Sequence, residues 1–375
     1  MRRTPSSVDI PDLQPSNRAD RLPVEYTDYA ERLKDHPYFD EFRSELDFLH
    51  EQGYVILPQA VSPDLCDKLA AYYSDVQTLT ADELPYVEYF HNHQSFYGVK
   101  YSEQVRLDSE GKFKMIDLFS HNALAREACF ADKLARFLSL IFASDVLAFQ
   151  QLGFIYGTEQ PIHQDTAYVR VSKPAMLAAS WIALEDIRPE TGELEFIPRS
   201  HNYNAFRFDS RGDKACELVE RDPERSLWFN YIDQAAHADF LKTMESLKPL
   251  YGCKKFAANK GDALIWISFL AHGGSKISEE NALSQATRKS LVTHYCPHPA
   301  AFPVYFKDVL HMPALKHKEN CYMSSKIYPL TPLPEAFSGP DYLAVNPDIK
   351  ASRRFSDDPG LHYLDHGRYE GRSLA

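Results

Sequence analysis

The chain has 375 residues, and its formal net charge is −12 because 53 acidic residues outnumber 41 basic ones. An acidic chain is a poor ligand for nucleic acid or an anionic membrane, so we expect neither as a partner. With 44% hydrophobic and 13% aromatic residues, the composition argues against a disordered chain. It predicts one large core with appended segments, or two domains.

The cysteines and the start of the chain bear on the cellular compartment. Six cysteines stand at irregular spacing without a C-x-x-C pair, which argues against a zinc ribbon or a disulfide framework. Residues 1–7 begin basic, but no apolar segment follows, so they do not predict a signal peptide. The most apolar stretch, residues 134–149, contains Arg136 and Asp145 and is too short and too polar to span a bilayer. We therefore expect a cytoplasmic protein with reduced thiols and no membrane insertion.

The first elements after the N-terminal tail are two predicted helices around a strand. Residues 38–52 have helical periodicity and end at Gly53, a residue type that favours a helix C-terminus. Residues 54–57 follow as a short strand, and Ser62 is a suitable N-cap for the second helix. Helical spacing predicts the buried side chains, namely Phe42, Leu46 and Leu49 in the first helix and Leu65, Leu69 and Tyr72 in the second.

Residues 85–101 hold an aromatic cluster that also contains His91 and His93. Because aromatic side chains mostly fill cores, we favour a packed loop or an edge strand here, with a wall of a substrate pocket as the alternative. The H-x-H pair could bind a metal, but nothing nearby in the sequence completes such a site. Residues 122–144 then show helical periodicity.

The rest of the first 300 residues is dominated by predicted strands. Many short strands broken by Gly and Pro turns, with helices gathered towards the N-terminus, predict a mainly β fold with helical cover, as an antiparallel barrel or sandwich. Charged residues from about 205 to 255 predict a largely helical insertion between two strands. The predicted strands are 146–156, 176–184, 194–197, 263–267 and 288–295.

The first candidate site follows the strand at 146–156. His163 and Asp165 are two residues apart, a spacing that puts both side chains on one face of an extended chain, where they could hold one metal ion. Alone the pattern is weak, since H-x-D is frequent by chance and also describes a surface histidine beside a solvated aspartate. A second histidine from elsewhere would complete the two-His, one-carboxylate triad of non-haem Fe(II) oxygenases.

Two downstream residues are candidates to complete this site. His272 ends an apolar strand and precedes two glycines, so it is either an inward-facing ligand or a capping or core histidine. Arg288 begins the following strand, and its planar fork suits a bidentate carboxylate. The alternative for Arg288 is a solvent-exposed residue at a strand end.

The order of these motifs carries a resemblance to a known family. The H-x-D motif is followed by W-I-A-L-E-D at 181–186, I-P-R-S-H at 197–201 and G-D-A-L-I-W at 261–266, and then by His272 and Arg288. Together with the predicted helix–strand–helix segment near the N-terminus, these motifs make residues 42–300 resemble the phytanoyl-CoA dioxygenase family of Fe(II)/2-oxoglutarate oxygenases.

This resemblance implies a double-stranded β-helix (jelly-roll) core that uses Fe(II), with 2-oxoglutarate and O2 as co-substrates. The family's iron ligands match His163, Asp165 and His272. Arg288 matches the arginine that pairs with the distal carboxylate of 2-oxoglutarate, with Ser290 as its helper. Further family contact positions for the co-substrate match Trp181, Lys114, Leu152 and Gln164.

The chain also departs from the family pattern. The interval between His163 and His272 is long because of the insertion, and the loop 275–287 is extended. Gly274 stands where some members carry a serine that helps to bind the co-substrate. Asp165 is retained, whereas Gly or Ala there is found in related halogenases, so the resemblance favours hydroxylation.

The implied activity is hydroxylation of an unactivated C–H bond of a small molecule, with release of succinate and CO2. Two alternatives remain: the same iron chemistry ending in desaturation, cyclisation or epimerisation, and a non-catalytic binding or scaffold protein that kept the barrel. The presence of all four residues of the iron and co-substrate sites speaks against the second. We expect the segments 85–101, 166–174 and 205–255 to select the substrate.

We expect a flexible tail at 1–25, the oxygenase domain at 26–300, an extension and linker at 301–339, and a small helical module at 340–375. The module resembles one appended to bacterial proteins including glycosyltransferases. That likeness suggests a bacterial protein, saccharide or cell-surface chemistry, and protein or glycan contact through the module. For the substrate we expect a saccharide-related or natural-product biosynthetic small molecule. His362 and His366 lie four apart on a predicted helix, where a packed face is favoured over a metal site.

Overall fold

The structure is a computed structural model. It describes residues 29–80, 84–92, 94–120, 122–169, 171, 174–203, 234–298, 323–324, 334, 336–351, 356, 359–363, 367 and 370–374. The predicted tail at 1–25, most of the predicted linker and the first part of the 205–255 insertion lie outside the described residues.

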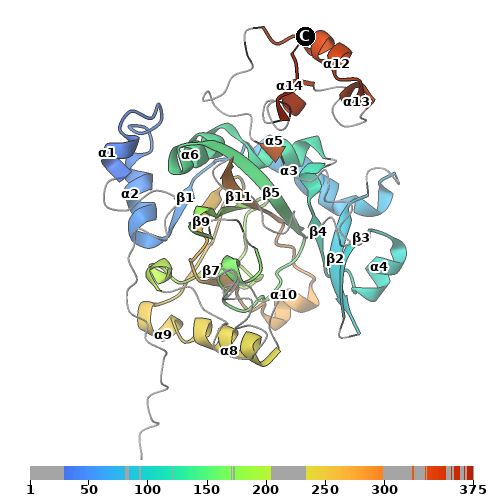
Figure 1. Ribbon diagram of the computed structural model, residues 1–375. Coiled ribbons are helices and arrows are strands. Elements are labelled where there is room, and N and C mark those ends of the chain that lie inside the picture. Colours follow the sequence, from blue (N-terminus) through green and yellow to red (C-terminus); the bar gives the residue numbers. More distant parts are fainter. Residues whose placement is uncertain are drawn as a thin grey trace, which may run out of the picture.

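Strands make up the centre of the molecule and helices its cover (Figure 1). The strands are β1 (Tyr54–Leu57), β2 (Tyr86–His91), β3 (Gln94–Lys100), β4 (Phe113–Ile116), β5 (Asp145–Phe154), β6 (Ala178–Ala183), β7 (Leu194–Phe196), β8 (Lys254–Lys255), β9 (Ala263–Ile267), β10 (His272–Gly274), β11 (Ser290–His298) and β12 (Met323–Ser324). The helices are α1 (Tyr29–Leu33), α2 (Arg43–Gln52), α3 (Pro63–Ser74), α4 (Glu103–Asp108), α5 (Ala123–Cys129), α6 (Asp132–Phe142), α8 (Gln234–Glu245), α9 (Lys248–Tyr251), α10 (Glu279–Leu283), α12 (Gly339–Val345), α13 (Pro347–Lys350) and α14 (Pro359–His362).

Two antiparallel sheets form the core. The larger has the order β1-β9-β6-β11-β5-β4-β2-β3, with β12 beside β5, and the smaller has the order β10-β7-β8. An isolated pair between His163 and His272 extends the smaller sheet beyond β10. The mainly β fold with helical cover is confirmed, and its two sheets form the expected double-stranded β-helix.

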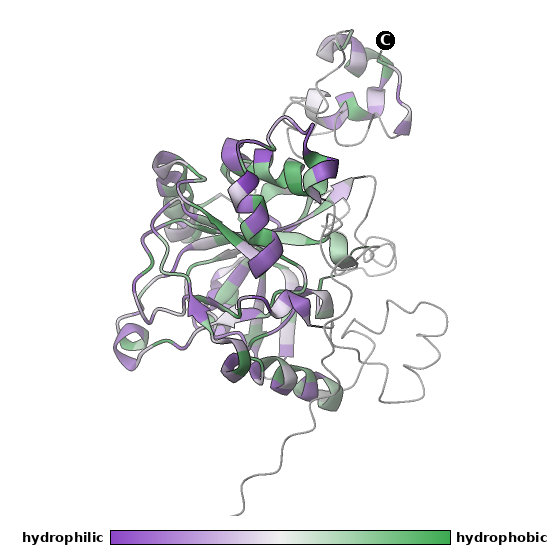
Figure 2. Ribbon diagram, turned by 90° about the vertical axis from the view of Figure 1, so that its left-hand side faces the viewer, coloured by the Kyte–Doolittle hydropathy of each residue, from purple (hydrophilic) through white to green (hydrophobic). Residues whose placement is uncertain are grey.

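Apolar side chains fill two layers around the larger sheet. The main core packs α2, α3, α5 and α6 against one face of that sheet, and a second cluster, which contains Trp181, Trp266 and Phe196, lies on the side of the smaller sheet. Figure 2 shows the strands largely in the hydrophobic colours, whereas the outer helices carry many hydrophilic residues. The second cluster borders the site described below.

The two predicted N-terminal helices are present, but α2 begins at Arg43, five residues later than predicted. Gly53 ends α2 in the left-handed conformation (φ 81°), and the side chain of Ser62 accepts a hydrogen bond from the Leu65 amide at the start of α3. The predicted buried face of α3 is wrong at one position, because Tyr73 is buried and Tyr72 only partly so. The Tyr73 hydroxyl reaches the Ser290 carbonyl on β11 at 3.3 Å, and that contact draws Tyr73 into the core.

The helical stretch predicted at 122–144 is two helices. α5 ends at Cys129, and α6 begins at Asp132 after Ala131 adopts an extended backbone (φ −53°, ψ 143°). This break lets α6 bury its own apolar face against the sheet independently of α5. Single-helix periodicity does not reveal the break, because both helices are amphipathic.

The aromatic segment at 85–101 is a hairpin, β2 and β3, at the edge of the larger sheet. The favoured edge-strand interpretation is therefore confirmed. His91 lies within this hairpin, where its Nδ1 is 2.8 Å from the Asp108 carbonyl, and His93 lies outside the described residues.

The apolar strand that precedes His272 ends earlier than predicted. β9 stops at Ile267, and a turn closed by the Leu270 amide on the Ile267 carbonyl (2.9 Å) carries the chain to the smaller sheet. His272 therefore begins β10 instead of ending the previous strand. The turn moves this residue from one sheet to the other, which brings it opposite His163.

The described C-terminal helices enclose a small core of their own around Tyr342 and Ile349. His362 is buried there, with its Nδ1 2.8 Å from the Tyr342 hydroxyl, in line with the packed face expected. His366 lies outside the described residues. Among the helices that the structure describes, none has the length and apolarity needed to cross a membrane.

Candidate active site

Three side chains from two distant segments meet between the sheets. The candidate ligand atoms of His163, Asp165 and His272 all lie within 4.8 Å of one another. His163 and His272 pair through two backbone hydrogen bonds of 2.8 and 2.9 Å, which fixes their rings at a centroid distance of 4.5 Å. Asp165 follows in a 3-10 turn, with its Oδ1 3.5 Å from His272 Nε2 and 3.9 Å from His163 Nε2.

Each of the three side chains is oriented by a second contact. Nδ1 of His163 lies 2.8 Å from the Pro161 carbonyl, and Nδ1 of His272 lies 3.0 Å from the Leu270 carbonyl. Because a carbonyl only accepts, each Nδ1 carries the proton, and Nε2 is left with its lone pair towards the other two residues. The Trp266 indole N–H donates to Oδ2 of Asp165 at 2.6 Å, leaving Oδ1 to face the imidazoles.

The charges in this cluster suit metal binding. Burial and the neighbouring His272 lower the pKa of His163 to about 3, so its imidazole is neutral at pH 7. Burial alone would raise the pKa of Asp165, but the imidazoles of His272, His294 and His163 hold it well below its usual range. Neutral imidazoles and an ionised carboxylate are the forms in which these groups bind a metal.

Arg288 is a buried cation without a carboxylate partner in the part of the chain that the structure describes. It is 3% exposed, its Nε has no hydrogen-bond partner, and its Nη2 makes a long 3.4 Å contact to the Tyr156 carbonyl. Its guanidinium carbon lies 5.5 Å from the Phe154 ring centroid and 5.4 Å from that of Trp181. Burial lowers its pKa to about 10, which still leaves it charged at neutral pH. Burying an unpaired guanidinium is costly, so this geometry suits an incoming anion.

One cavity of about 610 Å³ joins these groups. It is lined by the three clustered side chains, by Arg288, and by Trp181, Lys114 and Leu152 among the residues implied by the resemblance. The three segments expected to select the substrate all reach it: Glu88 and Tyr97 come from the hairpin, Tyr168 and Val169 follow the H-x-D motif, and His237 and Leu241 come from α8.

The other implied co-substrate positions have different surroundings. Gln164 is buried and donates its Nε2 to the Phe269 carbonyl at 3.0 Å, and it is not part of the cavity lining. Ser290 is likewise buried outside that lining. Lys114 faces the cavity, but its Nζ lies 3.4 Å from Glu88 Oε2, so a carboxylate already neutralises it.

The cavity side chains that were not singled out from the sequence include Trp266, His294 and Gln150. The last two could have been found by strand alternation, because His294 is an even number of residues from Arg288 and Gln150 is two from Leu152. Only the cross-strand register shows that these side chains lie side by side in the cavity. His294 lies with its Nε2 3.6 Å from Asp165 Oδ1.

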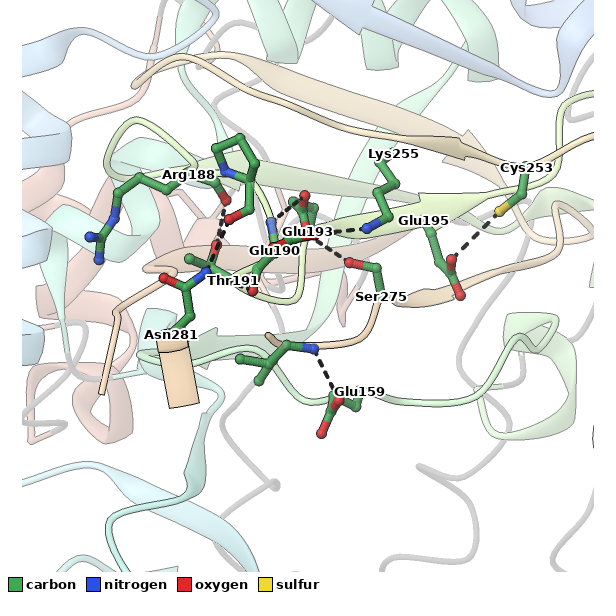
Figure 3. A network of polar contacts seen from close by, with 12 residues as sticks. Glu159, Arg188, Glu190, Thr191, Glu193, Glu195, Cys253, Lys255, Ser275 and Asn281 are labelled. Atoms are coloured by element: carbon green, nitrogen blue, oxygen red, sulfur yellow. Dashed lines mark hydrogen bonds and ion pairs between the residues drawn. The ribbon is translucent and has the colours of Figure 1, made fainter. Parts of the chain in front are cut away.

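A polar network behind the smaller sheet holds β10 in place (Figure 3). The Glu193 carboxylate accepts from Ser275 Oγ at 2.7 Å and from the Glu190 amide at 2.8 Å, with Lys255 Nζ at 3.8 Å. Burial opposes ionisation of Glu193, but the hydrogen bonds from Ser275 and backbone amides lower its pKa. Because Ser275 directly follows β10, this network fixes the strand that carries His272.

The glycines after His272 allow β10 to approach the H-x-D segment closely. A Cβ on Gly273 would stand 2.6 Å from the Gln160 carbonyl oxygen, and one on Gly274 would stand 3.0 Å from the Glu159 amide nitrogen. Both neighbours are backbone atoms, which cannot rotate away. Gly273 is therefore a condition for the His163–His272 pairing, and a side chain at 274 would be crowded against the 159–160 backbone.

The jelly-roll sheets, the two-His, one-carboxylate cluster and the buried arginine are the arrangement expected of an Fe(II)/2-oxoglutarate oxygenase. The family model for phytanoyl-CoA dioxygenase (PhyH) matches residues 49–282, so the chain belongs to the phytanoyl-CoA dioxygenase family. The donor set fits Fe(II), since two neutral imidazoles and one carboxylate lie together with no further protein ligand within the cluster of described residues.

Known proteins similar to this chain were found at the levels of sequence and structure. "Phytanoyl-CoA dioxygenase domain-containing protein 1" of Danio rerio is 24% identical over 184 residues, covering 40% of this chain and 62% of the relative's own length. Among solved structures, the epimerase SnoN in complex with Fe3+, alpha ketoglutarate and nogalamycin RO has a TM-score of 0.46 at 14% identity, covering 70% of this chain and 85% of that one. EctD from S. alaskensis with 2-oxoglutarate and 5-hydroxyectoine has a TM-score of 0.44 at 17% identity, covering 68% and 75%.

Proposed function

We propose that this enzyme hydroxylates an unactivated C–H bond of a small molecule while it converts 2-oxoglutarate and O2 to succinate and CO2. One observation carries the proposal: a cluster suited to iron and a buried, unpaired guanidinium suited to a carboxylate line the same cavity. The cavity volume, about 610 Å³, is in the range of small-molecule sites. The likeness of the C-terminal module to those of bacterial glycosyltransferases supports a substrate related to saccharides or natural products.

In this proposal His163, Asp165 and His272 would hold Fe(II). When bound, Fe(II) supplies the activation of O2 that is coupled to decarboxylation of the co-substrate. The protein's own part is orientation: the carbonyls of Pro161 and Leu270 fix the two imidazoles, and Trp266 fixes the carboxylate.

Arg288 binds the distal carboxylate of 2-oxoglutarate. Its guanidinium can donate two parallel hydrogen bonds, which sets the direction of the co-substrate as well as its affinity. The rings of Phe154 and Trp181 beside it keep water away, and the ion pair is stronger for that reason. Because Arg288 and the three proposed iron ligands line one cavity, the rest of the co-substrate would extend towards these ligands.

The test is anaerobic titration of the purified apo-protein with Fe(II) and 2-oxoglutarate, followed by the visible charge-transfer band of the chelate. We expect the band in the wild type, its loss in Asp165→Ala, and a weaker apparent affinity for 2-oxoglutarate in Arg288→Ala. Absence of the band in the iron-loaded wild type would overturn the proposal. Once a substrate is known, gain of one oxygen atom in the product distinguishes hydroxylation from desaturation, which removes two hydrogens.

A further inference from the structure

His294 is buried and Gln150 is half-buried, and neither is an iron ligand or a co-substrate contact in the proposed function, although His294 lies beside Asp165. Both ring nitrogens of His294, which is 3% exposed, have no hydrogen-bond partner within the described ranges, and neither has Oε1 of Gln150. Both residues line the cavity. A buried polar atom left without a partner costs free energy, so several of them facing one space call for a ligand there.

Strand pairing brings the two residues side by side. His294 on β11 is the register partner of Gln150 on β5, and on its other side it is paired with Ala179 of β6, which is in turn paired with Trp266. Directly paired residues point to the same face of a sheet. The β11–β5 register shifts between His294 and Tyr295, and such bulges redirect side chains next to active sites.

The pair and the co-substrate arginine contact different groups along the cavity face of β11. The guanidinium of Arg288 lies over Phe154 and Trp181, and Trp181 stands opposite Val292, one same-face step along β11 from His294. His294 instead stands beside Asp165, at 3.6 Å from its Oδ1. A co-substrate held between Arg288 and the iron ligands would therefore approach these ligands from the Arg288 end of β11.

The surroundings limit the chemistry of the missing partner. Oε1 of Gln150 needs a hydrogen-bond donor, and a neutral His294 imidazole offers one donor and one acceptor. An anionic group would be repelled by the Asp165 carboxylate beside His294. A neutral group that both donates and accepts, such as a hydroxyl or a carboxamide, satisfies all of these atoms.

We propose that His294 and Gln150 are the substrate-recognition pair of this oxygenase, and that the substrate presents a neutral hydroxyl or amide to them next to the carbon that is oxidised. The inference rests on the proposed function, because it places this group beside the iron site. It also restricts the substrate class, since a plain hydrocarbon chain would leave the pair unpaired.

The experiment uses the full chain loaded with Mn(II) and 2-oxoglutarate, and acetamide as the probe. Acetamide offers the required donor and acceptor, and a paramagnetic Mn(II) nearby shortens the T1 of its methyl protons. We expect strong relaxation in the wild type and at least a fivefold smaller effect in Gln150→Leu and in His294→Phe. Tyr295→Phe, which removes a buried hydroxyl from the same strand outside the cavity lining, is the matched control and should keep the wild-type effect.

Two results would overturn the inference. One is relaxation by the wild type that is absent, or unchanged in both variants. The other is a loss of the Fe(II)–2-oxoglutarate band in Gln150→Leu, which would assign the pair to the co-substrate. Gln150→Leu decides the matter if His294→Phe does not fold. A wild type that forms the band but does not relax acetamide leaves the proposed function intact, whereas a wild type without the band overturns the proposed function itself.

Discussion

Trp266 should control how tightly the site binds iron, although it is not a ligand. Its indole N–H donates a 2.6 Å hydrogen bond to Oδ2 of Asp165, in a fully buried setting. In Trp266→Phe, this oxygen loses its donor while most of the ring packing against His272 is kept. A hydrogen bond to a charged group contributes roughly 1.5–3 kcal/mol.

That free energy corresponds to an Fe(II) affinity on the order of 10–100-fold weaker, which is also the usual cost of losing a contact behind a metal ligand. The assay is titration of Fe(II) at saturating 2-oxoglutarate, read from the charge-transfer band under anaerobic conditions. The band itself should persist at high Fe(II), because all three ligands remain.

Tyr295→Phe is the matched control, since Tyr295 also donates a buried hydrogen bond, at 2.8 Å to the Cys129 carbonyl, but away from the cluster. It should lower the free energy of unfolding by about 1 kcal/mol and leave Fe(II) affinity unchanged. An Fe(II) affinity for Trp266→Phe within a factor of about 2 of the wild type would refute the argument that this hydrogen bond orients the carboxylate.

Three further predictions follow from the same geometry. Arg288→Lys should weaken 2-oxoglutarate binding by about tenfold or more, measured from the same band, with Fe(II) binding alone unchanged, because an ammonium lacks the planar fork. Gly273→Ala should abolish the band, since its Cβ would stand 2.6 Å from the Gln160 carbonyl oxygen and displace His272; a normal band would contradict this. Burial lowers the pKa of His50 to about 4, so the unfolded chain takes up a proton first and stability should fall between pH 6.5 and 4, by at most about 3 kcal/mol from this group. Urea unfolding of wild type and His50→Gln at pH 7 and 4.5 should show a shallower loss in the variant, and equal losses would refute the assignment.

Local patterns in the sequence determined much of this protein. The caps at Ser62 and Gly53 follow from residue types whose backbone preferences act within a few positions. The H-x-D spacing follows from the period of an extended chain, and the order of motifs identified the family. The arginine at 288 was also found from the sequence, because its chemistry limits what it can bind when buried.

Only the tertiary structure decided which distant residues meet. Strand register pairs His294 with Gln150, and the turn after β9 moves His272 into the smaller sheet opposite His163. Gln164 donates its side-chain amide to the backbone carbonyl of Phe269, which lies 105 residues away in the chain. Each of these outcomes depends on contacts between segments that are far apart in the chain. The geometry of these contacts is set by sheet pairing and turn conformation. The periodicity within one segment contains no information about either.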